Sequence, residues 1–373
     1  MGKPHIRPVG DDRFQVLFDI SPDPVTGKRR QRSRTVRGSR ADAEAKAERI
    51  VEEVDGGGWS DDGRITVRAL IELWLEARKA QVAPTTLDAY RQKLAHIDRI
   101  IGHRRVRDIT GGVLSGIYSR LRDEGLSGQS VLHVHRVMHK MLSDATRWGY
   151  TRSNAAAAAD PPRAQPEERE VWTADLAKAM LEEVRDHPWR VAWWLAIDAG
   201  MRRSEVAGLK WIHIDLDEKV IAVRETLVVV AGRDMWSDPK TARSRRLIAI
   251  DDSLLQVLRE ERLRQLELQM RDPAGWKGEG TVVCGDVGER VHPGRLSAAH
   301  RVIAKGAGMD PYITFHDLRH THATLALAAG VPANVVKERL GHASVQLTLD
   351  RYTHRVDELH REAADAVGRM LAT

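Results

Sequence analysis

The chain has very little cysteine and no long hydrophobic run. Cys284 is the single cysteine among 373 residues, so an internal disulfide bond is excluded, which fits a reducing compartment. The apolar run VAWWLAI at 191–197 is too short to cross a bilayer. The first residues, MGKPHIRP, lack the apolar core of a signal peptide. We therefore expect a cytoplasmic protein without a membrane segment.

Two common kinds of reaction centre are also missing. The sequence contains no G-x-x-x-x-G-K-[ST] motif, so a P-loop that binds nucleotide phosphates is excluded. Cys284 ends the apolar run TVVC at 281–284, a context that favours a buried structural thiol over a nucleophile.

Positive charge is present in modest excess, and it is unevenly distributed. The formal net charge is +6, and residues 64–169 hold 18 Lys/Arg against 11 Asp/Glu. Residues 28–40 hold seven bases and no acid. Such a distribution suits a polyanion bound by the first half of the chain, although a basic run can also be a solvated surface.

The periodicity predicts three structural units. In residues 1–58, strands are expected at 13–20 and 28–36, with a helix at 41–54 that DGGG ends. Residues 64–159 have helical spacing of apolar residues, and DPPRAQPEERE at 160–170 has the composition of a linker.

Residues 171–373 predict a helix-rich unit with a small antiparallel sheet. Short strands are expected near 211–214, 220–230, 245–250 and 281–284, and helices at 173–186, 188–199, 203–209, 252–270, 293–305, 317–329, 332–340 and 355–371.

Groups suited to phosphate chemistry lie in a fixed order in this last unit. Arg202 and Glu205 in DAGMRRSEVAGLKW (198–211) share a helix face, although an ordinary surface ion pair has the same spacing. His316 and Arg319 in HDLRHTH (316–322) are also three apart. His342 and Tyr352 follow in LGHASVQLTLDRYTH (340–354). A guanidinium fork matches two phosphate oxygens in a way that an ammonium group cannot.

This order and spacing resemble the tyrosine recombinase (phage-type integrase) family, which cuts and rejoins DNA through a covalent 3′-phosphotyrosine. The resemblance implies that Tyr352 is the nucleophile. It implies that Arg202 and Arg319 clamp the phosphate, with Glu205 supporting Arg202. By the same resemblance, His316 and His342 contact the reacting phosphate. The resemblance also implies that Lys240, in SDPKTARSRRLIAI (237–250), protonates the leaving 5′ oxygen.

The resemblance also implies the architecture and the partners. Residues 1–58 resemble an arm-type DNA-binding β-β-α unit, 64–159 a helical, SAM-like core-binding domain, and 171–373 the catalytic domain. The partners would be double-stranded DNA at attachment sites and three further copies of the chain on synapsed DNA. An excisionase or a DNA-bending protein could join them, and no cofactor or metal is needed. The bases expected on DNA are Lys28, Arg29, Arg30, Arg32, Arg34, Arg91, Lys93, Arg243 and Arg245, with Arg246 beside them.

Two other functions remain open at this stage. His316 and His320 have the spacing of a zinc-binding helix, although Asp317 stands where a zinc hydrolase has glutamate. A DNA-binding regulator that retains the fold but does not cleave DNA would show salt-sensitive binding alone.

Overall fold

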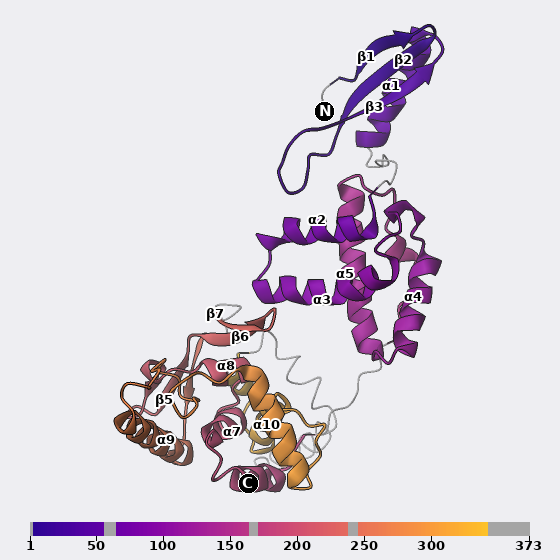
Figure 1. The fold of residues 1–373 in the computed structure, drawn as a ribbon. Coiled ribbons are helices and arrows are strands. Elements are labelled where there is room, and N and C mark those ends of the chain that lie inside the picture. The colour runs from indigo at the N-terminus through magenta and orange to yellow at the C-terminus, as the bar shows by residue number, and fades with distance from the viewer. Residues whose placement is uncertain (1–2, 56–64, 164–170, 238–244, 342–373) are drawn as a thin grey trace, which may run out of the picture. The chain divides into compact units, whose positions relative to one another are not determined.

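The computed structural model describes residues 3–55, 65–163, 171–237 and 245–341, which fall into two units, 1–167 and 168–373 (Figure 1). The predicted fold class, mainly α with small antiparallel sheets, is confirmed. Among the described residues, no helix has both the length and the apolar character needed to cross a membrane. The finer division into residues 1–58, 64–159, 160–170 and 171–373 stays a prediction.

The N-terminal part is a three-stranded antiparallel sheet backed by one helix. The elements are β1 (His5–Gly10), β2 (Arg13–Ile20), β3 (Arg30–Arg37) and α1 (Arg40–Asp55), and the strand order is β1-β2-β3. Alternation along β2 places Val16, Phe18 and Ile20 on the face that α1 covers.

The predicted β-β-α unit therefore lacked one strand. β1 was missed because it has no alternating apolar pattern and contains Pro8, which lacks an N–H for pairing. An edge strand tolerates this residue because only one of its sides must be hydrogen-bonded, and β1 pairs only with β2.

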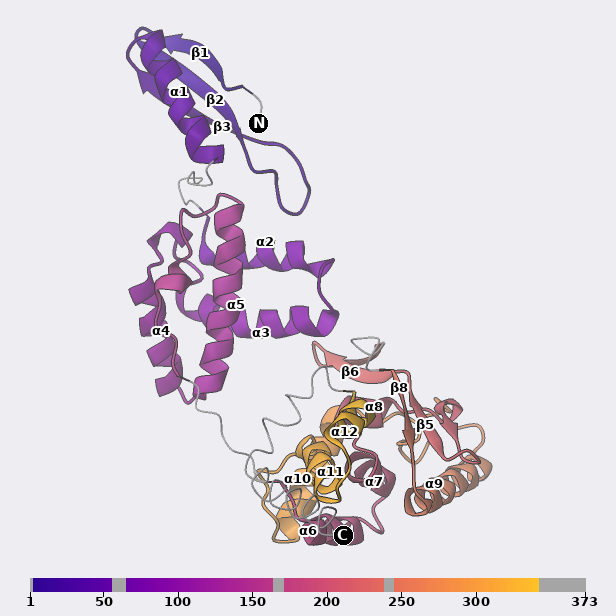
Figure 2. The ribbon, with the colours of Figure 1, turned by 180° about the vertical axis from the view of Figure 1, so that it is seen from behind.

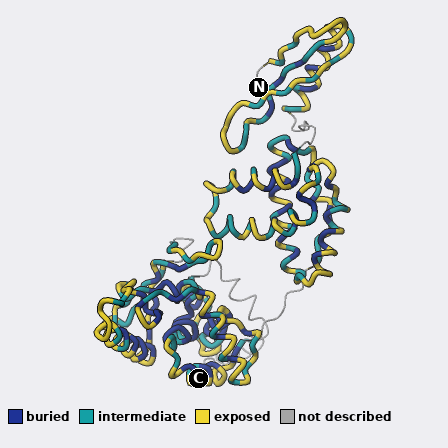
Figure 3. Tube along the Cα trace, viewed as in Figure 1, coloured by how far each residue is buried: buried dark blue, intermediate teal, exposed yellow. Residues whose placement is uncertain are grey.

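Most of the described residues 65–163 belong to four α-helices. They are α2 (Val67–Lys79), α3 (Pro84–Ile101), α4 (Gly111–Asp123) and α5 (Gly128–Arg147). Hydroxyl groups of Thr66, Thr110 and Ser127 cap three of them by accepting a backbone N–H. The helices bury a separate apolar core, which is the dark blue interior in Figure 3. The alanine run forms a short 3₁₀ helix, Ala155–Ala158, against α4 and α5.

The second unit packs helices around two small antiparallel sheets, whose strand orders are β4-β5-β8 and β6-β7. Its strands are β4 (Ile214–Asp215), β5 (Val220–Val223), β6 (Thr226–Val230), β7 (Arg233–Ser237) and β8 (Arg246–Ala249). Its helices are α6 (Ala174–Glu183), α7 (Arg190–Ile197), α8 (Arg203–Gly208), α9 (Asp252–Arg271), α10 (Pro293–Gly306), α11 (Asp317–Ala328) and α12 (Ala333–Leu340).

Three strand predictions in this unit need correction. The predicted strand 220–230 is two strands, β5 and β6, that belong to different sheets, and β7 was not predicted. Residues 211–213 form a 3₁₀ turn, so only Ile214–Asp215 is a strand there. The segment 281–284 makes isolated bridges at Thr281 and Cys284 instead of a strand.

Cys284 is a buried thiol, as the sequence predicts. Only 2% of its surface is exposed, and burial raises its pKa to about 12. It therefore stays protonated and unreactive at neutral pH.

Candidate active site

Arg202 lies at the start of α8, where a tight turn follows α7. Gly200 in this turn has φ +64°, and a Cβ atom there would lie 2.6 Å from the His322 ring, so only glycine fits without strain. The Arg202 backbone N–H donates to Glu205 Oε2 at 2.8 Å, and its Nη1 donates to Oε1 at 2.7 Å. The contact expected from the three-residue spacing is therefore present, and it joins Arg202 to the first turn of α8.

Arg319 reaches the same carboxylate from α11. Its side chain is buried, its Nη1 donates to the Gly200 carbonyl at 2.6 Å, and Nη1 lies 3.8 Å from Glu205 Oε2. The two arginines predicted to bind one phosphate are thus brought together across 117 residues of sequence by a shared carboxylate. Figure 2 shows α8, α11 and α12 together in the second unit.

Both arginines also hold the end of α12. Arg319 Nη2 donates to the carbonyl of Leu340, and Arg202 Nη2 donates to the carbonyl of Gly341 at 3.1 Å. Gly341 ends α12 in the left-handed conformation with φ 63°. The backbone just before His342 is therefore attached directly to the arginine pair.

Glu205 is the electrostatic centre of this cluster. Burial alone would raise its pKa, but hydrogen bonds and charge from Arg246, together with the charges of Arg202 and Arg319, lower the pKa to about 2. The carboxylate is therefore ionised at neutral pH, and it offsets part of the positive charge around it.

One prediction in this region is wrong. The sequence pattern placed Arg246 with bases that bind DNA phosphates, whereas its side chain is only 6% exposed and forms a fork with Glu205. Arg245 is exposed beside it. The difference lies in their places: Arg245 precedes β8, whereas Arg246 begins the strand on the side that alternates inward with Ile248.

His316 stands at the N-terminus of α11 and is exposed to solvent. Its ring meets the His320 ring edge to face, with 5.3 Å between centroids. Asp317 accepts hydrogen bonds from the Thr314 N–H at 2.8 Å and hydroxyl at 2.6 Å, so it caps a turn instead of serving as a general base. This use of Asp317 counts against the zinc hydrolase alternative.

No metal centre is formed by the part of the chain that the structure describes. Among those residues, no three His, Cys, Asp or Glu side chains are placed to hold one metal ion. His322, on the same helix as His320, hydrogen-bonds the Ile197 carbonyl through Nδ1 at 3.0 Å.

Four of the predicted site residues lie outside the described residues. They are Lys240, Arg243, His342 and Tyr352. Their roles remain predictions from the sequence.

The basic segment at 28–34 is divided between two environments. Lys28 is exposed, and so is Arg29, whose Nε is paired with Asp19 at 2.7 Å. Arg30, Arg32 and Arg34 are half-buried, because in β3 they lie opposite Ile20, Phe18 and Val16 on the side of the sheet that α1 covers. Arg30 also lies over the Tyr150 ring, 4.4 Å from its centroid.

The opposite side of this sheet carries a polar chain of hydrogen bonds. Arg7 Nε donates to Gln15 Oε1 at 2.9 Å, and Gln15 Nε2 donates to the Ser33 hydroxyl at 3.0 Å. The three residues are on adjacent strands, so this side presents a continuous row of hydrogen-bonding groups. The charge-based prediction missed it because only Arg7 is charged.

In the helical part, Arg91 is exposed on α3 and Lys93 is half-buried. A longer basic row, which the sequence prediction missed, follows one side of α5. The row consists of exposed residues at helical spacing: Gln129, His133, Arg136, Lys140, Ser143 and Arg147. The only acid in α5, Asp144, is buried. The signal was therefore available in the sequence as a helix whose outward face has bases and no acid.

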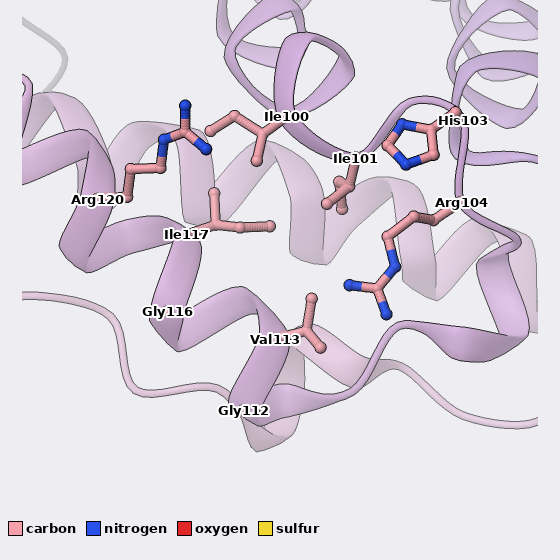
Figure 4. Close-up of a pocket in the computed structure, with 9 residues that line it drawn as sticks. All are labelled: Ile100, Ile101, His103, Arg104, Gly112, Val113, Gly116, Ile117 and Arg120. Carbon is pink, nitrogen blue, oxygen red and sulfur yellow. The ribbon is translucent and has the colours of Figure 1, made fainter.

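A hollow of about 580 Å³ lies between α3 and α4 in the first unit. Figure 4 shows Arg104 and Arg120 on opposite sides of a floor formed by Ile100, Val113 and Ile117. It contains none of the predicted catalytic residues.

Comparison with known sequences defines the class of protein to which this site belongs. The sequence profile of the phage integrase family matches residues 171–358. The chain therefore belongs to the phage integrase family and is a site-specific tyrosine recombinase, as its motifs predicted.

Individual relatives extend the likeness beyond the matched segment. A XerC-like tyrosine recombinase of Caldanaerobacter subterraneus is 26% identical over 353 residues, covering 88% of this chain and 89% of its own. The ICEBs1 integrase of Bacillus subtilis is 24% identical over 375 residues, covering 98% and 100%.

Solved structures share the fold. The Tn1549 transposon integrase in complex with circular intermediate DNA has a TM-score of 0.66 at 18% identity, with 80% of this chain and 99% of that chain covered. A lambda integrase dimer bound to a COC′ core site has a TM-score of 0.60 at 19% identity, with 94% of each chain covered.

Proposed function

We propose that the chain integrates a phage or other mobile element by cutting and rejoining DNA through a phosphotyrosine formed by Tyr352. The observation that supports this most strongly is the pairing of Arg202 and Arg319 around Glu205, directly before the segment that bears His342 and Tyr352. Two guanidiniums held together favour binding of one phosphodiester and stabilise the extra charge of its transition state.

Each remaining group then has a defined task. The Tyr352 phenol attacks phosphorus, and its proton passes to a base. The proposed base is His316, at the N-terminus of α11. The bond from phosphorus to the 5′ oxygen breaks, and Lys240 protonates that oxygen as it leaves. His342 donates a hydrogen bond to a phosphate oxygen. The products are a 3′-phosphotyrosine and a free 5′ hydroxyl, so bond energy is retained and rejoining needs no ATP.

The three segments of the chain divide the work on DNA. Residues 1–58 would bind arm-type sites, 64–159 would bind the core site, and 171–373 would carry out strand exchange, with 160–170 as the connecting strap. Lambda integrase has been solved as a tetramer on a Holliday junction, and we propose the same assembly for four copies of this chain. It would act in the bacterial cytoplasm, with an excisionase or a DNA-bending protein as further partners.

The basic row of α5 is the best candidate for the core-site contact. Arg136 and Lys140 are exposed on one side of the helix, four residues apart, and no exposed acid lies on α5 to repel a phosphate backbone. In the N-terminal unit, exposed Lys28 and Arg29 together with the polar side of the sheet offer a second DNA surface.

The attachment site is first identified by mapping the ends of the mobile element that carries the gene for this chain. The test is then whether the chain forms a covalent adduct with a nicked duplex that contains this site. The wild-type chain should form a protein–DNA adduct that survives denaturation. Tyr352→Phe should abolish the adduct and leave duplex affinity unchanged. Tyr312→Phe, which alters a phenol that is 88% exposed and lies four residues before His316 in the sequence, is the matched control and should form the adduct normally.

Two results would overturn the proposal. An adduct that persists with Phe at 352 would mean that another residue is the nucleophile. Binding of the attachment site without any adduct from the wild-type chain would identify a DNA-binding regulator instead of a recombinase.

A further inference from the structure

Arg246 is the first residue of β8 and follows the segment that contains Lys240. In the sheet it lies opposite Val223 of the central strand β5, which holds its backbone in place. Its side chain is almost completely buried, so it does not face a DNA surface.

The Arg246 guanidinium binds two elements besides its own. Nη1 donates to Glu205 Oε1 at 3.0 Å and Nη2 donates to Oε2 at 2.9 Å, a two-point fork onto one carboxylate. Nε donates to the carbonyl of Arg339 in α12 at 2.6 Å. One side chain therefore connects β8 with α8 and with the last turn of α12.

Glu205 stands between this fork and the two phosphate-binding arginines. It receives one hydrogen bond from the Arg202 guanidinium and one from the Arg202 backbone N–H, and it lies 3.8 Å from Arg319. From Arg246 it receives both hydrogen bonds of the guanidinium fork. Because the carboxylate is only 2% exposed, water cannot replace a lost partner. Without the fork, the carboxylate would turn further toward the other two guanidiniums and draw them from their places.

We propose that Arg246 is a positioning residue for strand cleavage. It acts by holding the Glu205 carboxylate in the position from which that carboxylate orients Arg202 and Arg319. It does not itself contact the DNA. This inference rests on the proposed function, because the orientation of Arg202 and Arg319 affects cleavage only if these two arginines bind the reacting phosphate.

A second arginine of the chain serves as a control, because it forms the same kind of buried fork away from the predicted site and could affect only folding. Arg264 of α9 also forms a two-point fork onto a buried carboxylate, with Nε 2.9 Å from Glu261 Oε2 and Nη2 2.8 Å from Oε1. Glu261 is 2% exposed at its side chain, as Glu205 is, but its partners are not predicted site residues. Substitution of either arginine removes the same kind of interaction, and only one of them is expected to alter the chemistry.

The experiment compares Arg246→Lys with Arg264→Lys in the full chain. Lysine retains the charge but cannot form the fork. Adduct formation is measured in a single turnover at saturating nicked duplex, and duplex affinity is measured separately. We expect Arg246→Lys to slow adduct formation roughly 10²-fold, the size expected when reacting groups are displaced by about 1 Å. Affinity should change less than about threefold, and Arg264→Lys should leave both quantities within about threefold of wild type.

A second measurement covers the case in which Arg246→Lys does not fold. Glu205→Gln/Arg246→Gln removes the carboxylate and its fork partner together, and it is compared with Glu205→Gln alone, so that Arg202 and Arg319 have lost the carboxylate in both chains. If Arg246 acts through Glu205, the two variants should form adduct at equal rates. A double variant slower by tenfold or more would contradict the proposal.

The outcomes also separate this inference from the proposed function. No adduct from the wild-type chain would refute the function itself. A normal wild-type adduct, with Arg246→Lys as fast as Arg264→Lys or with affinity lost in step with rate, would refute only the positioning role.

Discussion

His322 is a buried histidine held in its neutral form. Its Nδ1 donates to Ile197, and its Nε2 accepts from Arg339 Nε at 3.2 Å. Burial, and after it the charge of Arg339, lowers the pKa of His322 to about 4. The folded form therefore binds a proton less readily than the unfolded chain does, so this residue stabilises the fold above its ordinary pKa and loses that contribution as pH falls toward 4.

We predict that acidification lowers the free energy of unfolding of the wild-type chain more than that of His322→Gln. The glutamine can hydrogen-bond but does not titrate. Between pH 7 and pH 5 the stability advantage of the wild type should shrink by about 2 kcal/mol. Urea unfolding of both chains at the two pH values measures this difference.

Comparing the wild type with His322→Gln also cancels the pH dependence of stability that Asp198 contributes, which has the opposite sign. Burial, with the charge of Asp251 second, raises the pKa of Asp198 to about 6, so Asp198 stabilises the fold at low pH and that effect is lost as pH rises. Both chains share this group. Equal losses in the two chains between pH 7 and pH 5 would mean that His322 is not the titrating residue.

At the scale of single residues, the sequence could predict contacts that lie within one helix. Arg202 with Glu205 follows from a spacing of three, since such residues share a helix face. The fork from Arg246 to Glu205 joins a strand to a helix 41 residues away, and only tertiary packing decides it. A local pattern therefore predicted the contact of Arg202 with Glu205 and assigned the wrong environment to Arg246.

At the scale of elements, α2 and α5 are joined by one buried carboxylate. Asp144 accepts from Trp74 Nε1 at 2.6 Å, from Arg147 Nη2 at 2.6 Å and from Arg78. Because its side chain is 7% exposed, its charge depends on these donors for stabilisation in place of water.

We predict that Asp144→Asn destabilises the helical part of the first unit. The substitution leaves buried donors without an anion and should cost about 3 kcal/mol of unfolding free energy, as expected when a buried pair is broken. Thermal or urea unfolding of the full chain measures the loss.

Asp98→Asn provides the matched control for this element. Asp98 pairs with Arg68 at 2.9 Å, but the pair is exposed to solvent. The cost should therefore stay below about 1 kcal/mol. A loss as large as that of Asp144→Asn would show that burial is not the deciding factor.

Element prediction succeeded where a periodic face was long and failed where pairing was irregular. The helix expected at 252–270 is α9, Asp252–Arg271, because its apolar stripe runs through five turns. β1 and β7 are short, and each pairs along one side only, so their sequences need not alternate. Thr281 and Cys284 lie in an apolar run that packs in the core without joining a strand ladder.

At the scale of the whole molecule, the uneven charge noted in the sequence becomes a test of DNA binding. The α5 row lies within residues 64–169, where bases outnumber acids. If that row contacts phosphates, each contact releases condensed counterions and makes binding more sensitive to salt.

The logarithm of DNA affinity falls linearly with the logarithm of the salt concentration. We predict that Arg136→Ala and Lys140→Ala each make this fall shallower, by about one in the magnitude of the slope. Fluorescence anisotropy with a short duplex of unrelated sequence measures this slope. Arg99→Ala is the control, because the Arg99 charge is already paired with Glu124. Slopes that stay at the wild-type value in both α5 variants would exclude this face from DNA.

The arginine cluster has one further consequence, which concerns how activity should vary with acidity. Guanidinium groups are not deprotonated in proteins, and the pKa of Glu205 is about 2. Three guanidiniums and one carboxylate therefore leave a net charge of +2 across the whole range in which a bacterium lives. If this cluster binds the phosphate, as proposed, its charge does not vary with pH in that range. A bell-shaped activity profile would then report on imidazole, amine or phenol groups and not on the arginine cluster.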